Sequence, residues 1–171
     1  MTPELMSQID VVVSAEHRMN LVELEHMALD QLEGYPGFKR QHRYLSRWRN
    51  ESAICLINFV IDNYKHRPTI NMTFNSPPAP ANYEAGIQMI IAEYETLRLQ
   101  YVSLARLSLA SNNDELMQFA ENKLCWIAKT KMKYHRDLEE SRGKSADYIQ
   151  LRSERMHEKY RLKEQKFSIN Y

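Results

Sequence analysis

Glycine and proline are scarce in this chain, and most of them gather in a few places. The 171 residues include only four glycines and six prolines. Most lie in a Gly-Tyr-Pro-Gly turn at 34–37, a connection at 67–82 and an Arg-Gly-Lys-Ser turn at 142–145. Folds rich in β-strands need many more tight turns at this length. We therefore expect an all-α fold built from a few long helices.

The segments between these breaks show helical periodicity. A fourth break, Ser-Asn-Asn-Asp at 111–114, supplies helix-capping residues without glycine or proline. Apolar residues recur every three or four positions in the long segments, as is typical of helices with one face in a bundle interior. The expected helices cover about 6–32, 38–66, 83–110, 114–140 and 145–161.

The apolar stripes indicate which face of each helix belongs to the core. In the first helix the stripe is Val13, His17, Leu21, Leu24, Ala28 and Leu32. In the third helix it is Ile87, Ile90, Ile91, Tyr94, Leu97, Tyr101 and Leu104. We expect each of these faces to lie in the interior of the bundle.

The lengths of the connections predict the topology. The short breaks at 34–37 and 111–114 make the helices on either side antiparallel neighbours. The connection at 67–82 is long enough to run the length of a bundle, which leaves the second and third helices parallel. The expected architecture is a four-helix bundle with one long crossover and a short fifth C-terminal helix, in a single domain covering 1–171.

The charge balance and the cysteine count exclude several classes of function. The chain has 23 Lys and Arg against 22 Asp and Glu, so it lacks the basic surplus that nucleic-acid binding needs. The first residues show neither a secretion signal nor a membrane span. The two cysteines, Cys55 and Cys125, predict buried thiols in a reducing compartment. We expect a soluble cytoplasmic protein with no nucleic-acid and no membrane partner.

Two charged stretches allow more than one interpretation. The region 139–166 contains eight Lys and Arg and six Asp and Glu, which predicts a charged helix, partly docked and partly solvated. A basic surface for an acidic partner is the alternative. The stretch 42–49 is the strongest basic patch, with Arg43, Arg47 and Arg49, and we expect it on a solvated or interface-forming face.

The order of the elements and several short motifs resemble those of the ferritin family. Arg18-Met19-Asn20-Leu21 resembles a run in the family's first helix, and Tyr83-Glu84-Ala85-Gly86-Ile87 resembles the opening of its third. The residues from Leu109 to Glu121 resemble the family's turn into the fourth helix. Ser145-Ala146-Asp147-Tyr148-Ile149 resembles the start of its fifth.

The resemblance implies iron as the bound metal, but the expected ligands are sparse. A di-iron centre takes glutamates from two helices and Glu-x-x-His pairs, because residues three apart share a helix face. In the second helix the expected pair falls near Glu51 and Cys55, so the imidazole is missing. Glu23, Glu51 and Glu95, each on a different helix, form one candidate metal site. The alternative is that all three are rim carboxylates in salt bridges.

One further carboxylate has a candidate role by resemblance. Glu121 falls near the acidic lining of the family's threefold channel, where it is a candidate for guiding cations, or it is an ordinary surface charge. We assign no catalytic residue and do not expect an enzyme, because most ferroxidase ligands are absent.

The sequence thus leaves three hypotheses for function. The first is a catalytically degraded ferritin-like subunit that stores or binds iron. The resemblance implies that it assembles with itself or other ferritin subunits in a 24-subunit cage. The second is a helical bundle that mediates protein–protein interaction and has lost its iron function. The third and weakest is a working di-iron ferroxidase.

Overall fold

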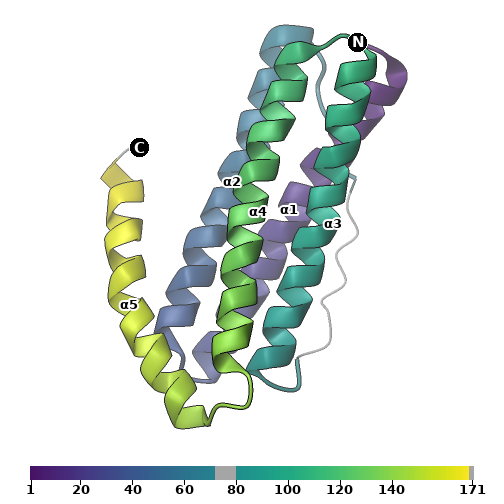
Figure 1. Ribbon diagram of the computed structural model, residues 1–171. Helices are drawn as coiled ribbons and strands as arrows, with labels where there is room; N and C mark the ends of the chain where they lie inside the picture. Colours follow the sequence, from purple (N-terminus) through teal and green to yellow (C-terminus); the bar gives the residue numbers. More distant parts are fainter. Residues whose placement is uncertain (72–79, 170–171) are drawn as a thin grey trace.

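The computed structural model describes residues 1–71 and 80–169, with side chains described as far as residue 165. The helices are α1 (Pro3–Leu32), α2 (Pro36–Tyr64), α3 (Tyr83–Ala110), α4 (Asp114–Ser141) and α5 (Ala146–Ile169). Figure 1 shows α1 to α4 side by side in a bundle, with α5 on one side of it. No strand occurs in the described ranges. The expected all-α four-helix bundle with a fifth C-terminal helix is confirmed.

Side-chain caps fix several helix ends. The Thr2 hydroxyl accepts a hydrogen bond from the Leu5 amide and starts α1, and Asn82 accepts one from Ala85 and starts α3. Asn113 starts α4 in the same way and also accepts a hydrogen bond of 2.8 Å from the Tyr64 hydroxyl. The predicted break at 111–114 is therefore also a tie between α2 and α4.

The connection between α2 and α3 contacts α1 at both of its ends. The Thr69 amide donates to the Asp10 carboxylate and the Asn71 amide donates to the Ser14 hydroxyl, both at 3.0 Å. At the other end of the connection, Pro80 lies with His26 beside a small cavity. The chain thus moves from the start of α1 to its second half, as the predicted crossover requires. Residues 72–79, in the middle of that crossover, lie outside the described residues.

The predicted core face of α3 is confirmed, whereas that of α1 was wrong except at Val13, which is buried. Tyr94, Leu97 and Tyr101 on α3 are buried. On α1, however, Leu32 is 84% exposed and Ala28 is also exposed. The buried face of α1 instead contains Ile9, Val12, Glu16, Met19, Val22, Glu23, His26 and Asp30. At about 100° per residue, the predicted stripe lies almost opposite this face, because polar side chains occupy the core positions.

The fifth helix continues beyond its predicted end at 161 and docks on α2. The Ser153 hydroxyl accepts a hydrogen bond of 3.0 Å from the Gly37 amide. A Cβ at Gly37 would lie 1.7 Å from the Ser153 carbonyl oxygen, so only glycine permits this approach. Farther along α5, Tyr160 is buried and Glu164 forms ion pairs with Arg40 and Arg43 of α2. The expectation of a partly docked charged helix is therefore confirmed.

The surface corrects one expectation. Cys55 and Cys125 are both exposed, so the prediction of buried thiols was wrong. Within the ranges the structure describes, no helix combines the length and the apolar character needed to cross a membrane.

Candidate functional site

Polar side chains form two layers inside the bundle. Glu16 and Glu23 lie seven residues apart on α1, and both are fully buried. Because α2 runs antiparallel to α1, Arg49 and His42, also seven residues apart, lie opposite them. On α3, Tyr101 and Tyr94 repeat the same spacing. A seven-residue step is about two helical turns, so α1, α2 and α3 each present a polar residue to both layers.

The first layer, which we call the Glu16 layer, consists of Glu16, Arg49, Ser52 and Tyr101. Arg49 Nη1 donates to Glu16 Oε2 at 3.0 Å. The other carboxylate oxygen, Oε1, accepts from the Ser52 hydroxyl at 3.0 Å and from the Tyr101 hydroxyl at 2.7 Å. The Arg49 guanidinium lies 4.2 Å from the ring centroid of Trp126 on α4, a cation–π contact. Both oxygens of this carboxylate are therefore satisfied by protein donors.

The second layer, which we call the Glu23 layer, consists of Glu23, His42, Tyr94 and Tyr134. His42 Nδ1 lies 2.6 Å from Glu23 Oε2, and the Tyr94 hydroxyl donates to Oε1 at 2.7 Å. The Tyr134 hydroxyl, from α4, lies 3.0 and 3.1 Å from the two oxygens. Burial raises the pKa of Glu23, but the hydrogen bonds from His42 and the two tyrosines outweigh it and hold the pKa below its usual range.

His42 bridges two carboxylates. Its Nε2 lies 3.3 Å from Asp30 Oδ2, while its Nδ1 faces Glu23. Burial lowers the pKa of His42, but Asp30 and Glu23 together raise it above its usual value. Burial also raises the pKa of Asp30 to about 7, against the opposing effect of His42. The favoured state is an imidazolium held between two acidic side chains.

A second histidine lies beside this bridge without joining it. The ring of His26 lies 5.7 Å from that of His42, and burial followed by the charge on His42 lowers the pKa of His26 to about 4. His26 is therefore neutral at physiological pH. A cavity of about 20 Å³ beside His26, Asp30 and His42 has room for a single water molecule.

The four glutamates predicted as metal ligands lie in different environments. Glu23 is in the core, Glu51 is half-buried on α2, and Glu121 is exposed on α4. Glu95 on α3 is at the surface, where hydrogen bonds from Arg98 and from Lys131 lower its pKa to about 2. In the described part of the chain, no three His, Cys, Asp or Glu residues form a group that could hold a metal ion. Metal binding by these four glutamates stays a prediction.

Solved ferritin structures share this architecture. An open-pore ferritin from the hyperthermophilic archaeon Archaeoglobus fulgidus matches with a TM-score of 0.86 and 11% identity, over 92% of this chain and 98% of that one. An engineered closed form of the A. fulgidus ferritin matches with a TM-score of 0.85 and 12% identity, over 92% and 96%. A humanized archaeal ferritin matches with a TM-score of 0.86 and 11% identity, over 92% and 97%. The chain has the ferritin fold.

Similarity at the level of sequence is much weaker. No protein-family model matches the chain, and no curated protein sequence matches it. The likeness to ferritins therefore concerns the fold, and the chemistry has to be judged from the side chains of this chain.

The core residues do not fit a pair of iron ions. A di-iron centre needs several carboxylates and imidazoles turned toward a shared space between the helices. Here each layer contributes one α1 carboxylate, and its oxygens already accept hydrogen bonds from side chains of α2 and α3. In the Glu16 layer the positive charge is the guanidinium of Arg49 itself. In the core of this ferritin fold, the carboxylates that a metal ion would need are paired with protein side chains.

Sequence reasoning missed most of these core residues. Arg49 was expected on a solvated or interface-forming face with Arg43 and Arg47, but its side chain is only 2% exposed. The matching seven-residue spacing of Glu16 with Glu23 and of His42 with Arg49 is the signal in the sequence that points to the two layers. That signal has a meaning only after α1 and α2 are known to be antiparallel neighbours.

Proposed function

We propose that this chain is a cytoplasmic subunit of a ferritin-like cage that binds and stores iron without a working ferroxidase centre of its own. It assembles with copies of itself or with an oxidation-competent ferritin subunit, in the 24-subunit arrangement expected from the resemblance. The observation that carries the loss of catalysis is the pairing of both α1 core carboxylates with cationic side chains of α2, Glu16 with Arg49 and Glu23 with His42.

The outward face of α1 supports assembly. Leu21, Leu24, Ala28 and Leu32 follow one another at three- and four-residue steps, on the side of α1 opposite the core. Leu32 is 84% exposed, Ala28 is exposed, and Leu21 and Leu24 are half-buried. A continuous apolar stripe on a helix that already has a complete core face is typical of a protein–protein contact. We assign this outer stripe to the contact between subunits.

Surface carboxylates supply the iron-binding part of the proposal. Glu51 and Glu121, on α2 and α4, offer the hard oxygen ligands that iron prefers. Glu95, on α3, is the third surface candidate and forms ion pairs with Arg98 and Lys131. The single-domain chain thus contributes binding sites to the cage, while a partner subunit oxidises the iron.

Co-expression with a tagged, oxidation-competent ferritin tests the proposal. We expect the untagged chain to be retained with the tagged subunit in particles of cage size, and the Leu24→Glu variant to be lost from them. The Leu109→Glu variant is the matched control, because Leu109 is 60% exposed on α3 and lies outside the outer stripe. Absence of the wild-type chain from the particles would count against co-assembly.

Ferrous oxidation, followed by absorbance, tests the loss of catalysis. We expect the chain alone to oxidise Fe²⁺ no faster than buffer does. A rapid protein-dependent phase that disappears in Glu51→Ala would contradict the proposal and favour a working ferroxidase.

A second candidate function uses the same outer stripe. A bundle that has lost its iron function could present Leu21, Leu24 and Leu32 to a different protein. The two functions differ in particle mass, because only the cage subunit forms a large assembly without that partner.

A further inference from the structure

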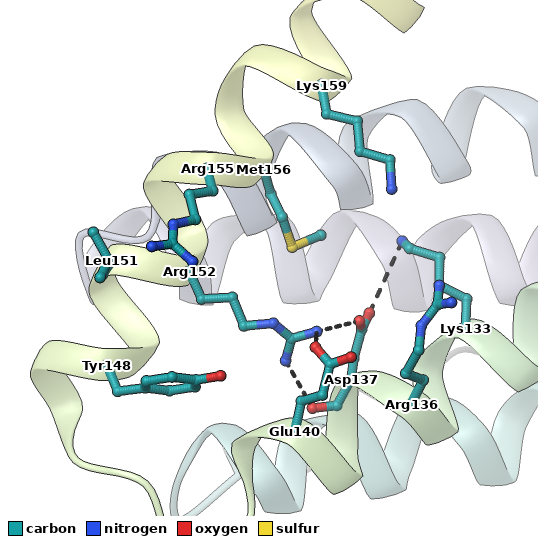
Figure 2. A pocket seen from close by; sticks show the side chains of 10 residues that line it. All are labelled: Lys133, Arg136, Asp137, Glu140, Tyr148, Leu151, Arg152, Arg155, Met156 and Lys159. Atoms are coloured by element: carbon teal, nitrogen blue, oxygen red, sulfur yellow. Dashed lines mark hydrogen bonds and ion pairs between the residues drawn. The ribbon is translucent and has the colours of Figure 1, made fainter.

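A cavity of about 460 Å³ lies between α4 and α5, away from the two core layers (Figure 2). Its α4 side is formed by Lys133, Arg136, Asp137 and Glu140, and its α5 side includes Tyr148, Leu151, Arg152, Arg155, Met156 and Lys159. Both sets follow three- and four-residue steps, so each occupies one face of its helix. The helix α5 docks along α2 and does not pack closely against α4. The space between the facing sides of α4 and α5 is the cavity. Its volume is in the range of small-molecule sites.

The lining of this cavity has more positive than negative charge. Five of its side chains are cationic and two are acidic. The two acids are both engaged by the same cation, since Arg152 Nη2 lies 2.5 Å from Asp137 Oδ1 and 2.8 Å from Glu140 Oε2. Figure 2 shows these contacts at one end of the cavity. Lys133 forms only a long ion pair of 4.0 Å with Asp137, and no ion pair of Arg136, Arg155 or Lys159 is found among the described residues.

Lys133 forms the floor of the cavity, where the burial of its ammonium charge is unfavourable for folding. Its ammonium is shielded from solvent and has no hydrogen-bond acceptor among the described residues, and Asp137 Oδ2 is 4.0 Å away. Figure 2 shows the ammonium of Lys159 directed toward that of Lys133. Burial lowers the pKa of Lys133 to about 7; the attraction of Asp137 and Glu23 opposes this shift, and the smaller repulsion of Lys159 and Lys163 adds to it.

Three lysines meet around one buried ring. The Nζ atoms of Lys133, Lys163 and Lys159 lie 4.7, 5.0 and 6.0 Å from the ring centroid of Tyr160. Cation–π contacts account for part of this arrangement, but the ring supplies no hydrogen-bond acceptor for the ammonium groups, and like charges from two helices repel one another. An anion in the cavity would relieve that repulsion.

The other end of the cavity has a different character. Tyr148 and Leu151 are 40% and 48% exposed, and Met156 lies between them and the lysines in Figure 2. Guanidinium and ammonium groups suit the oxygens of a phosphoryl group, and an aromatic and two apolar side chains suit an organic moiety beside it.

We propose that the cavity between α4 and α5 is a binding site for a small anion with two or more phosphoryl charges. Arg136 and Lys159 at its exposed rim contact the phosphoryl oxygens, and Lys133 supplies positive charge from the floor. Arg152 stays with its two carboxylates and fixes the wall. This site is independent of iron and of assembly.

Isothermal titration calorimetry of the iron-free full-length chain with inorganic pyrophosphate tests this site. We expect saturable binding of one pyrophosphate per chain in 150 mM chloride. Lys159→Met should weaken binding about tenfold and Lys133→Met about threefold, because the first loses a direct contact and the second loses charge at a distance. Lys129→Met is the matched control: Lys129 is exposed on α4, one turn before Lys133, and does not line the cavity.

The Lys129→Met control distinguishes a specific binding site from nonspecific attraction of the anion to positive surface charge. Weaker binding in Lys159→Met with unchanged binding in Lys129→Met supports the site. No binding of pyrophosphate at millimolar concentration, or an equal loss in both variants, overturns it. Adenosine diphosphate gives a second arm: tighter binding than pyrophosphate, reduced by Tyr148→Ala, identifies an organic phosphate, and equal binding identifies an inorganic one.

Discussion

At the scale of single residues, Arg49 determines how the buried charge of Glu16 is neutralised in the core of this ferritin fold. Its guanidinium is placed where it neutralises Glu16 and covers Trp126, and both members of the ion pair are almost fully buried. A buried pair of this kind adds little net stability over an apolar pair, but breaking it leaves one charge alone in the core. The pair therefore fixes the structure while it occupies the carboxylate that a metal ion would need.

Replacing Arg49 alone should be strongly destabilising. We expect Arg49→Met to lower the free energy of unfolding by about 3 kcal/mol, because Glu16 is left buried with only hydroxyl donors. The double variant Glu16→Gln/Arg49→Met should recover at least half of that loss. Urea denaturation at one fixed protein concentration measures both, and a loss below about 1 kcal/mol in Arg49→Met would show that the pair is not closed to water.

Replacing Lys133 should raise the free energy of unfolding, in contrast to replacing Arg49. The pKa of Lys133 is about 7 in the folded chain against an ordinary lysine value of 10.5, so the unfolded chain binds the extra proton between these pH values. The penalty for burying this charge is therefore full below pH 7 and disappears as the pH rises toward 10.5. We expect Lys133→Met to stabilise the fold by about 2 kcal/mol at pH 6.5, allowing for partial solvation, and by almost nothing at pH 10.

Thermal unfolding across this pH range checks that expectation. Asp137, Glu23, Lys159 and Lys163 also face Lys133, and they are present in both proteins, so the difference between variants reports Lys133. A constant difference at every pH would mean that Lys133 is solvated and ordinary. Residues that lower the stability of a fold are often found at functional sites, which agrees with the place of Lys133 in the proposed anion site.

At the scale of elements, the docking of α5 depends on one close approach. The Gly37 position at the start of α2 leaves no space for a side chain beside the Ser153 backbone. We expect Gly37→Ala to separate α5 from α2 and to speed hydrogen exchange in 149–164 at least tenfold. Ser153→Ala, which removes only the hydrogen bond from the Gly37 amide, should cost about 1 kcal/mol and leave α5 docked. Equal exchange in wild type and Gly37→Ala would contradict this contact.

The elements differ in how far the sequence predicts them. The core face of α3 was predicted correctly because its buried positions, such as Ile90 and Leu97, are apolar or aromatic. The core face of α1 was not, because the charged residues Glu16 and Glu23 occupy core positions and an apolar pattern does not reveal them. Helical periodicity finds an apolar stripe, and on α1 the most regular stripe is the outer one. The partners of the core carboxylates lie on other helices, so their pairing follows from the fold alone.

At the scale of the whole molecule, the chain has two features without a partner inside the bundle. The first is the outer stripe of α1, which we assign to contacts between subunits. The second is the cationic cavity between α4 and α5. Neither feature needs a metal in the core, which is occupied by ion pairs. The molecule has the ferritin fold, and its interior contains the two ion-paired layers.

Disrupting the outer stripe should change the assembly and not the subunit. We expect Leu24→Glu to dissociate the assembly and to leave the helix content measured by circular dichroism unchanged, because a charge at a half-buried contact prevents association. Leu109→Glu should change neither property. If Leu24→Glu kept the wild-type particle size, the contact would lie elsewhere.

The central claim, that this chain is a cage subunit, is tested most directly by its particle mass. Size-exclusion chromatography with multi-angle light scattering gives that mass for the purified, untagged 171-residue chain in solution. We predict a single hollow assembly of about 24 chains of 20.3 kDa each. A monomer or a dimer at micromolar concentration would contradict the claim.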